Sequence, residues 1–486
     1  MLFNSMAFAI FLPIVFLLYW ICPSKYRYVF LLAVSYYFYM SLDVRYVFFL
    51  LFTTVISYLL ARCFDISKSL RAKRIGLVSG ILSLTGVLLL YKYLDFFFEI
   101  INTAAQSFSI PIQTPTLKLM LPVGISFYTF QTLGYLIDVY KGKYPAEKHF
   151  GYYSLFVSFF PQLLSGPIGR GDKLLPQFKE VRLFDSSKAA YGLKLMSVGY
   201  FKKLVVANLL VSSVDSVFDN VNSYIGLVYI IVTIMFAIQI YCDFSGYTDI
   251  AVGTAMLFGI ELTQNFKSPY FSHSIKEFWS RWHISLSTWF RDYLYIPMGG
   301  NRVGRLRHAL NLMVTFLVSG LWHGAGLNFL VWGGLHGLYQ IIESLLFHGK
   351  SNKKGKTAAS RKGLLSLFSL ALTNFFVCLA WVFFRAGNLT DAWRMISLSF
   401  FQINDLNEYL KTAVICLDMT YTHMVYISIP VILLGIYDYA SLKTDVISYI
   451  SSKKIWVRYP VYILFLLIIL LFSEKGVSTE FYYFQF

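Results

Sequence analysis

The chain has 486 residues, of which 57% are hydrophobic, 19% are aromatic and only 14% are charged, with a mean hydropathy of +0.60. This composition excludes an ordinary soluble domain and indicates a polytopic membrane protein. The formal net charge of +17 would suit nucleic-acid binding, but the basic residues fall in short loops between apolar runs, a distribution that sets membrane topology. We therefore predict an all-α protein in a lipid bilayer, with no nucleic-acid partner.

Apolar runs near the length that a bilayer requires recur along the chain and predict about twelve crossings. They cover residues 5–22, 28–42, 44–61, 75–94, 119–140, 204–218, 224–240, 308–326, 327–346, 363–384, 424–440 and 457–473. Two aromatic segments, 150–164 and 277–296, are too short or too polar to cross cleanly. We expect them to be re-entrant or interfacial pieces.

The first run, Met6 to Trp20, lacks the basic start and the small-residue cleavage site of a signal peptide, so we expect a retained first helix. Loops 62–74, 350–362 and 443–458 are rich in Lys and Arg and are predicted to be cytoplasmic. Three runs precede the first of them, which places the N-terminus outside.

Residues 170–203 are also basic and are assigned to the cytoplasmic side, whereas the more acidic segment 387–423 fits an external loop. Three parts are predicted: a core over 1–349, a basic linker over 350–363, and final helices over 364–486. The five cysteines show no paired spacing, so neither a disulfide framework nor a metal site is expected.

The first polar cluster in apolar sequence is Tyr241-CDFSGYTDI, directly after the run 224–240. On a helix, Asp243 and Tyr247 share one face, Ser245 and Asp249 share another, and Gly246 lets a neighbouring backbone come close. Two carboxylates there are costly without partners. They belong either to a satisfied interhelical network or to a site in contact with substrate.

The second cluster is Glu277-FWSRWHISLSTWFRDYLYIPMGGNR. Its spacing predicts an amphipathic helix with an aromatic face and an adjoining polar stripe. The aromatic face consists of Trp282, Leu286, Trp289 and Tyr293, and the stripe of Arg281, Ser285, Thr288 and Asp292. The tryptophans alone are typical of a membrane interface, whereas His283, flanked by apolar groups, is a candidate site residue.

The Pro297-MGGNR turn ends this cluster and is expected to expose backbone N–H groups beside Arg302, Arg305 and Arg307. Guanidinium groups and backbone N–H groups both bind phosphate oxygens. The turn is therefore either a contact for a phosphate-bearing ligand or a plain cytoplasmic loop.

The third cluster, Ser319-GLWHGAGLNF, places His323 at membrane depth, with His336 thirteen residues later. Glycines 320, 324 and 326 permit a break or a close approach, so that the imidazole can line a cavity. An imidazole that burial keeps neutral is a base near neutral pH. A lone buried histidine is more often structural, but with His283 nearby a site in which both act becomes the better hypothesis.

At these residues the sequence resembles a bacterial member of the membrane-bound O-acyltransferase family, in the branch that supports O-acetylation of alginate, peptidoglycan and related polysaccharides. The likeness covers nearly the whole chain, through the opening 1–20 and blocks 121–141, 159–170, 241–251, 277–302 and 319–337. It implies a ring of about 11–13 tilted transmembrane helices, with re-entrant and interfacial helices, around a central tunnel.

The resemblance also implies a catalytic role for His323, a second active-site position at His283, and acetyl-CoA as the acyl donor, with no bound cofactor. His323 would take the proton of an acceptor hydroxyl as that hydroxyl attacks the thioester, and His283 or a nearby polar group would stabilise the oxyanion. An acetyl-histidine intermediate is a less economical route. The protein is expected in the bacterial cytoplasmic membrane.

The chain ends in the aromatic hexapeptide 481–486, in which Tyr483 is either an acyl relay, as the resemblance implies, or an interfacial anchor. No Gly-Asp-Ser nucleophile motif is present, so a separate extracytoplasmic Ser-His-Asp type acetyltransferase is the expected partner. Two alternatives stay open: D-alanyl transfer to teichoic acid by a related branch, and a transporter with a proton or ion path through His283, His323, Asp243 and Asp249.

Overall fold

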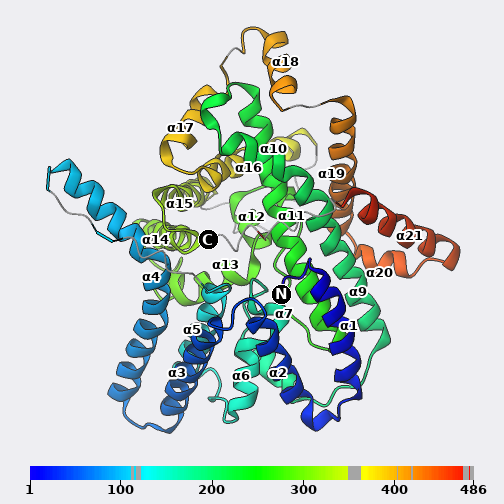
Figure 1. Cartoon of the computed structure of the whole chain (residues 1–486). Helices are drawn as coiled ribbons and strands as arrows, with labels where there is room; N and C mark the ends of the chain where they lie inside the picture. The colour runs from blue at the N-terminus through cyan, green and yellow to red at the C-terminus, as the bar shows by residue number, and fades with distance from the viewer. Residues whose placement is uncertain are drawn as a thin grey trace. The chain divides into compact units, whose positions relative to one another are not determined.

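The computed structural model describes residues 1–110, 114–115, 122–347, 363–401, 403–417, 420–473 and 481. All regular structure in these residues is helical (Figure 1), which confirms the predicted all-α class. The predicted linker 350–363 lies outside the described residues except for its last position. The predicted three-part division therefore stays a prediction.

Helices account for most of the chain, and their bounds are as follows. The α-helices are α1 (Met6–Ile21), α2 (Arg27–Met40), α3 (Tyr46–Ile66), α4 (Leu70–Ser107), α5 (Ile125–Tyr140), α6 (Phe150–Ser158), α7 (Phe160–Leu163), α8 (Gly171–Lys179), α9 (Ser186–Tyr200), α10 (Asn208–Phe218), α11 (Leu227–Leu257), α12 (Ile275–Arg281), α13 (Ile284–Phe290), α14 (Arg305–His323), α15 (Leu327–Phe347), α16 (Leu364–Arg385), α17 (Leu389–Leu398), α18 (Leu406–Cys416), α19 (Tyr421–Ser441), α20 (Val446–Ser451) and α21 (Ile455–Phe472). The shorter turns are the 3-10 segments η1 (Ser24–Tyr26), η3 (Val221–Ser223) and η4 (Pro269–Phe271), and the π-helical segments η2 (Phe201–Ala207) and η5 (Arg291–Tyr295).

Seven helical stretches among the described residues are long and apolar enough to cross a membrane. They are Tyr46–Ile66, Leu70–Ser107, Ser186–Phe218, Leu227–Leu257, Leu364–Arg385, Met424–Ser441 and Ile455–Phe472. Every predicted apolar run overlaps a helix, but α1, α2 and α5, with 16, 14 and 16 residues, are shorter than an upright crossing needs. The multi-pass character is confirmed, and the number of about twelve crossings stays a prediction.

Two expected loops contain helices. The span Ser186–Phe218 begins well before residue 204, so the end of the basic segment 170–203 lies within a helix and not in a cytoplasmic loop. The expected external loop 387–423 likewise contains α17 and α18. Local charge suggested loops in both places, yet helix formation depends on the partners that each segment meets.

The chain forms two compact units, one of residues 1–193 with 251–263 and the other of residues 194–250 with 264–485. In the first unit, α6 and α7 are short and buried, and the re-entrant or interfacial assignment of 150–164 stays a prediction. The side-chain amides of Gln131 and Gln162 both donate to the carbonyl of Phe156, and Gln162 does so at 2.9 Å. The carbonyl of Phe156, at the end of α6, is thereby satisfied inside the protein.

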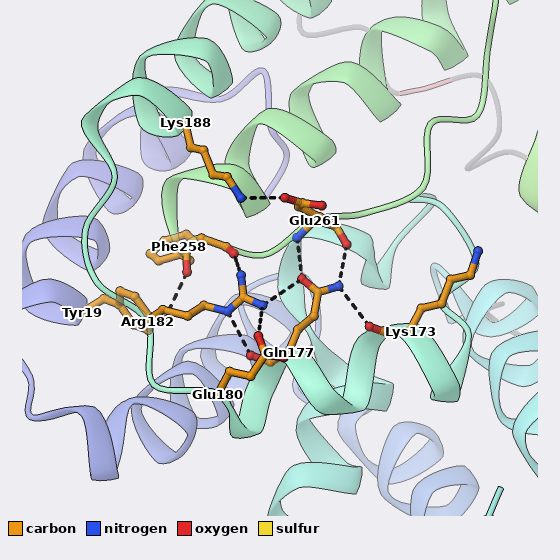
Figure 2. A network of polar contacts seen from close by, with 9 residues as sticks. Tyr19, Lys173, Gln177, Glu180, Arg182, Lys188, Phe258 and Glu261 are labelled. Carbon is orange, nitrogen blue, oxygen red and sulfur yellow. Dashed lines mark hydrogen bonds and ion pairs between the residues drawn. The ribbon is translucent and has the colours of Figure 1, made fainter.

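A polar network joins separate segments of the first unit, with Arg182 near its centre (Figure 2). The Arg182 guanidinium donates to the carbonyl of Gln177 at 3.2 Å, to the carboxylate of Glu180 at 2.9 Å and to the carbonyl of Gly259. Gln177 bridges onward, because its side chain donates to the carbonyl of Glu261 and accepts from the Glu261 N–H. The network fixes the loop after α11 against the end of α8.

In the second unit, two helix backbones meet where glycines replace side chains. A Cβ atom at Gly246 would lie 2.7 Å from the carbonyl oxygen of Gly199, and one at Gly199 would lie 2.6 Å from that of Gly246. Such separations leave no room for a methyl group. The close approach predicted for Gly246 is therefore confirmed, and it brings the π-helical segment η2 against α11.

We expect Gly246→Ala to lower the stability of the protein by about 1–3 kcal/mol, because the added methyl group overpacks this crossing. Gly435→Ala is the matched control, since Gly435 lies in α19 and a Cβ there meets nothing within 4 Å. That control should be neutral or gain up to about 1 kcal/mol of helix propensity. Thermal unfolding in detergent measures both, and equal melting temperatures would contradict the contact.

Candidate active site

His283 lies at a break between two short helices. Its φ of 43° and ψ of 55° are left-handed, and it precedes the first residue of α13, Ile284. Asn265 holds the break, since its carbonyl accepts from the Ile284 N–H at 2.9 Å and its Oδ1 from the Ser285 N–H at 3.1 Å. Histidine and asparagine enter this region more readily than most residues. The imidazole is fully buried, with its centroid 4.7 Å from that of Phe244.

His323 is the last residue of α14, where the chain turns toward α15. A Cβ at Gly320 would lie 2.3 Å from the carbonyl oxygen of Phe329, and one at Gly324 would lie 2.1 Å from the Phe329 ring. The predicted glycine crowding around His323 is therefore present. It ends α14 at the histidine and lets α14 and α15 pack side by side (Figure 1).

Both histidines lie against one tryptophan. The Trp322 ring centroid is 6.2 Å from that of His283 and 4.7 Å from that of His323. His323 is 3% exposed and also contacts Trp332 and Phe384, at centroid distances of 4.9 and 5.4 Å. The structure thus brings the two predicted site residues from α14 and from the α12–α13 break into one aromatic environment. Water is largely excluded from both rings.

A third histidine, His336 on α15, belongs to the same aromatic group. It is fully buried, its ring centroid lies 5.0 Å from that of Trp332, and its Nδ1 accepts from Trp279 Nε1 at 3.2 Å. That bond assigns the ring proton to Nε2. The sequence points to His336 only through its spacing from His323; Trp332, four residues earlier on the same helix face, is the signal that could have indicated an aromatic setting.

Burial has a direct consequence for protonation at the break. His283 lies outside the seven membrane-crossing stretches, and desolvation lowers its pKa to about 3. It is therefore neutral at physiological pH. A neutral imidazole offers one N–H donor and one lone pair, which suits orientation of a substrate oxygen better than proton delivery.

The lowered pKa of His283 predicts a pH dependence of stability. The unfolded chain, with an ordinary histidine pKa near 6.5, binds a proton that the folded protein excludes, so stability falls as the pH drops below about 6.5. At pH 5 the resulting decrease in the free energy of unfolding is roughly 2 kcal/mol. We expect His283→Asn, which suits the left-handed backbone but does not titrate, to show a smaller drop in melting temperature between pH 7 and 5. Parallel curves for the two proteins would contradict this.

The two carboxylates of the first polar cluster have lysine partners. Lys202 Nζ lies 2.7 Å from Asp249 Oδ2, and Lys203 forms an ion pair with Asp243. All four side chains are nearly inaccessible. The network interpretation of Asp243 and Asp249 is therefore the one that the structure favours. Ser245 and Tyr247 are buried in the same helix.

Lys202 and Lys203 were missed as site residues, because their basic neighbours suggested a cytoplasmic loop. Both lie in η2 and are at most 5% exposed. One signal was available: two carboxylates in apolar sequence require two cations, and this adjacent pair supplies them.

The predicted continuous amphipathic helix over 277–296 is wrong, because the chain breaks at His283. Arg281 ends α12 and pairs with Glu277 at 2.6 Å, whereas Asp292 lies in η5 and pairs with Arg291 at 3.0 Å. The two therefore share no polar stripe. Trp282 and Trp289, at 1% and 8% exposure, pack inside the protein and do not form an exposed interfacial face.

The turn that begins at Pro297, predicted to expose N–H groups beside three arginines, has the arginines but not the free N–H groups. The N–H groups of Gly299, Gly300 and Arg302 donate to the carbonyls of Ile296, Tyr295 and Gly299, so they are not offered to a ligand. Arg305 and Arg307 line an open groove of about 730 Å³. The other lining residues are Met298, Gly304, Leu306, Leu310 and Asn311; Arg302 is exposed but is not among them. Anion binding here would depend on guanidinium groups.

Tyr483 lies outside the described residues, but Phe481, two residues earlier, is described. Phe481 is 1% exposed, and its ring centroid lies 4.7 Å from that of Tyr247. This residue of the aromatic ending is therefore inside the protein. The role of Tyr483 stays a prediction.

Comparison with known proteins gives the family. The model of the membrane-bound O-acyltransferase family matches residues 146–382. A probable alginate O-acetylase, AlgI, of Pseudomonas aeruginosa is 38% identical over 413 residues, which cover 84% of this chain and 77% of that protein. A peptidoglycan O-acetyltransferase of Helicobacter pylori is 35% identical over 431 residues, or 82% of this chain and 79% of that protein.

A teichoic acid D-alanyltransferase of Bacillus subtilis is also similar, at 27% identity over 290 residues, which cover 56% of this chain and 70% of that protein. The likeness to the O-acetylating relatives is thus both stronger and longer. Together with the helical membrane architecture, these matches show that the chain belongs to the membrane-bound O-acyltransferase family and is a multi-pass acyltransferase.

Proposed function

We propose that this protein takes acetyl from cytoplasmic acetyl-CoA and passes it across the bacterial cytoplasmic membrane for O-acetylation of an extracytoplasmic polysaccharide. The observation that carries the proposal is the burial of His283 and His323 on the same tryptophan, in a chain similar to an alginate O-acetylase and a peptidoglycan O-acetyltransferase. Alginate, peptidoglycan or a similar polymer is the final acceptor.

In the proposed chemistry the two imidazoles have different tasks. His323 takes the proton of the acceptor hydroxyl while that oxygen attacks the thioester carbonyl. The tetrahedral intermediate collapses and the carbon–sulfur bond breaks. The thiolate of coenzyme A takes the proton back from His323 and leaves as the thiol. His283, or a polar group near it, orients the carbonyl or stabilises its oxyanion. Acetyl is thereby transferred without change of oxidation state.

We propose that arginine side chains recognise acetyl-CoA by its phosphate groups. Arg305 and Arg307 line the open groove beside the start of α14, the helix that ends at His323. Guanidinium groups bind phosphate oxygens through charge-assisted hydrogen bonds. Arg302 is exposed outside the groove lining, so we assign it a secondary contact at most.

Transfer of label from acetyl-CoA tests the function. Purified protein in proteoliposomes is incubated with radiolabelled acetyl-CoA, and acetylated protein or released coenzyme A is measured. We expect turnover with acetyl-CoA and none with D-alanine on a carrier protein, whereas the reverse result would favour the D-alanyl alternative. Proton or ion flux without acetyl transfer would instead favour a transporter.

The Tyr483 relay makes a separate prediction. If Tyr483 accepts acetyl on its phenolic oxygen, Tyr483→Phe abolishes polysaccharide acetylation while the aromatic ring and protein amount are retained. Acetylation of the glycan in cells and the acetylated peptide 474–486 by mass spectrometry are the two measurements. Unchanged glycan acetylation in the Tyr483→Phe cells would leave only an anchoring role.

The extracytoplasmic partner is the last element of the proposal. A Ser-His-Asp type acetyltransferase would receive acetyl from this protein and place it on sugar hydroxyls. We expect membranes that contain this chain alone to acetylate added glycan far less than membranes that contain both proteins. Normal efficiency from the chain alone would remove the need for a partner.

A further inference from the structure

The burial of Phe481 is not explained by the helix that precedes it. None of the residues of α21 is buried, and Trp456 near its start is 86% exposed. Phe481, nine residues beyond the end of α21, is by contrast only 1% exposed. Nine residues can span up to about 30 Å. Phe481 therefore occupies a separate buried site in the second unit, here called its seat, and does not continue the exposed surface of α21.

That seat is built from η2 and α11. Lys203 Nζ lies 4.5 Å from the centroid of the Phe481 ring, and the Tyr247 ring meets the Phe481 ring edge to face, with an interplanar angle of 86°. Lys203 is held by its ion pair with Asp243. Asp243 and Tyr247, four residues apart, lie on the same face of α11.

The chemistry of this seat selects an aromatic group. A desolvated ammonium group over a ring face gains a cation–π attraction that an aliphatic side chain of similar size does not provide. A π-helical turn within a long helix is uncommon and is frequently found at functional sites. Lys203 lies on such a turn, within the segment Phe201–Ala207.

We propose that Lys203, held by Asp243, and Tyr247 form a receptor for the aromatic C-terminal segment, with Phe481 as its anchor and Lys203 as a positioning residue. The consequence for Tyr483, which rests on the proposed function, is that its position depends on a contact made two residues earlier. The buried Lys203–Asp243 pair thereby serves to place the aromatic segment that contains Phe481.

Photocrosslinking of the full-length protein in its membrane tests the seat directly. A benzophenone amino acid at position 481 should crosslink to peptides that contain Lys203 or Tyr247, as mapped by mass spectrometry. The same amino acid at position 456 is the matched control and should crosslink mainly to lipid, because Trp456 is exposed. Crosslinks from position 481 to lipid alone, or to other helices, would overturn the proposal.

Variants separate the cation–π contact from simple packing. Phe481→Trp should keep the C-terminus resistant to carboxypeptidase in intact membranes, whereas Phe481→Leu should increase the digestion rate by about tenfold. The paired change Lys203→Met with Asp243→Asn removes the cation without leaving a buried charge and should act like Phe481→Leu. Equal digestion rates for Phe481→Trp and Phe481→Leu would show that the ring is not recognised.

These measurements do not depend on acetyl transfer, so the two proposals fail separately. A crosslink to Lys203 or Tyr247 in a protein that transfers no acetyl would keep the seat and remove the proposed function. If the seat guides Tyr483, Phe481→Leu should also lower acetylation of peptide 474–486 while coenzyme A release during the first turnover is retained. Loss of both in equal measure would instead indicate general damage to the site.

Discussion

Replacing His323 by alanine is expected to lower acetyl transfer by about 10²- to 10⁴-fold, the range usually lost with a general base. His323 ends α14, is 3% exposed, and is enclosed by Trp322, Trp332 and Phe384. An acceptor hydroxyl in this environment has little access to water as a proton acceptor. Coenzyme A release by His323→Ala protein in proteoliposomes is the measurement.

The control must exclude loss of fold. His323→Gln keeps much of the side-chain volume but provides no comparable base, so its activity should resemble that of His323→Ala while its melting temperature stays closer to wild type. His336→Gln alters a neighbouring buried histidine that contacts the same Trp332 and should retain more activity. Activity of His323→Ala within tenfold of wild type would rule out His323 as the base.

The second large effect is expected on stability. Asp249→Asn should destabilise the protein by about 3–5 kcal/mol, because it leaves the Lys202 ammonium without its carboxylate in a buried site. The Lys202 and Asp249 side chains are 6% and 11% exposed, and their charged atoms lie 2.7 Å apart. Thermal unfolding in detergent, with matched lipid content, measures the loss.

An exposed pair provides the comparison. Lys188 and Glu261 also lie 2.7 Å apart, but their side chains are 46% and 62% exposed, so Glu261→Gln should cost no more than about 1 kcal/mol. The double change Lys202→Met with Asp249→Leu removes both charges of this pair but leaves the buried Asp438, which also interacts electrostatically with Lys202, so it should recover only part of the stability lost in Asp249→Asn. Similar losses for Asp249→Asn and Glu261→Gln would contradict burial of the first pair.

The sequence predicted the helical class and the surroundings of His323 well, because both depend on local information. The length of an apolar run can be counted in the sequence, and the three glycines around His323 show how closely a second backbone can approach. The close approach at Gly246 is predictable for the same reason, since its contact with Gly199 needs only the absence of side chains.

The break at His283 had no comparable local signal. The spacing of Trp282, Leu286 and Trp289 fits a helix, and only Asn265, distant in sequence, shows why the backbone leaves it. Lys202 and Lys203 likewise looked like loop residues, because their charges are tolerable inside only through carboxylates about forty residues later. Both the break at His283 and the burial of the two lysines depend on contacts between residues far apart in sequence, which local periodicity does not show.

The π-helical segment Phe201–Ala207 also sets a rotational phase. An α-helix advances about 100° per residue, so a π turn, which accommodates one extra residue, offsets everything after it by about that angle. Removing a single residue from this segment would restore a regular helix and turn the faces of α9 and α10 relative to each other. A deletion before Lys202 would rotate both lysines away from their carboxylates on α11, although neither lysine had been mutated.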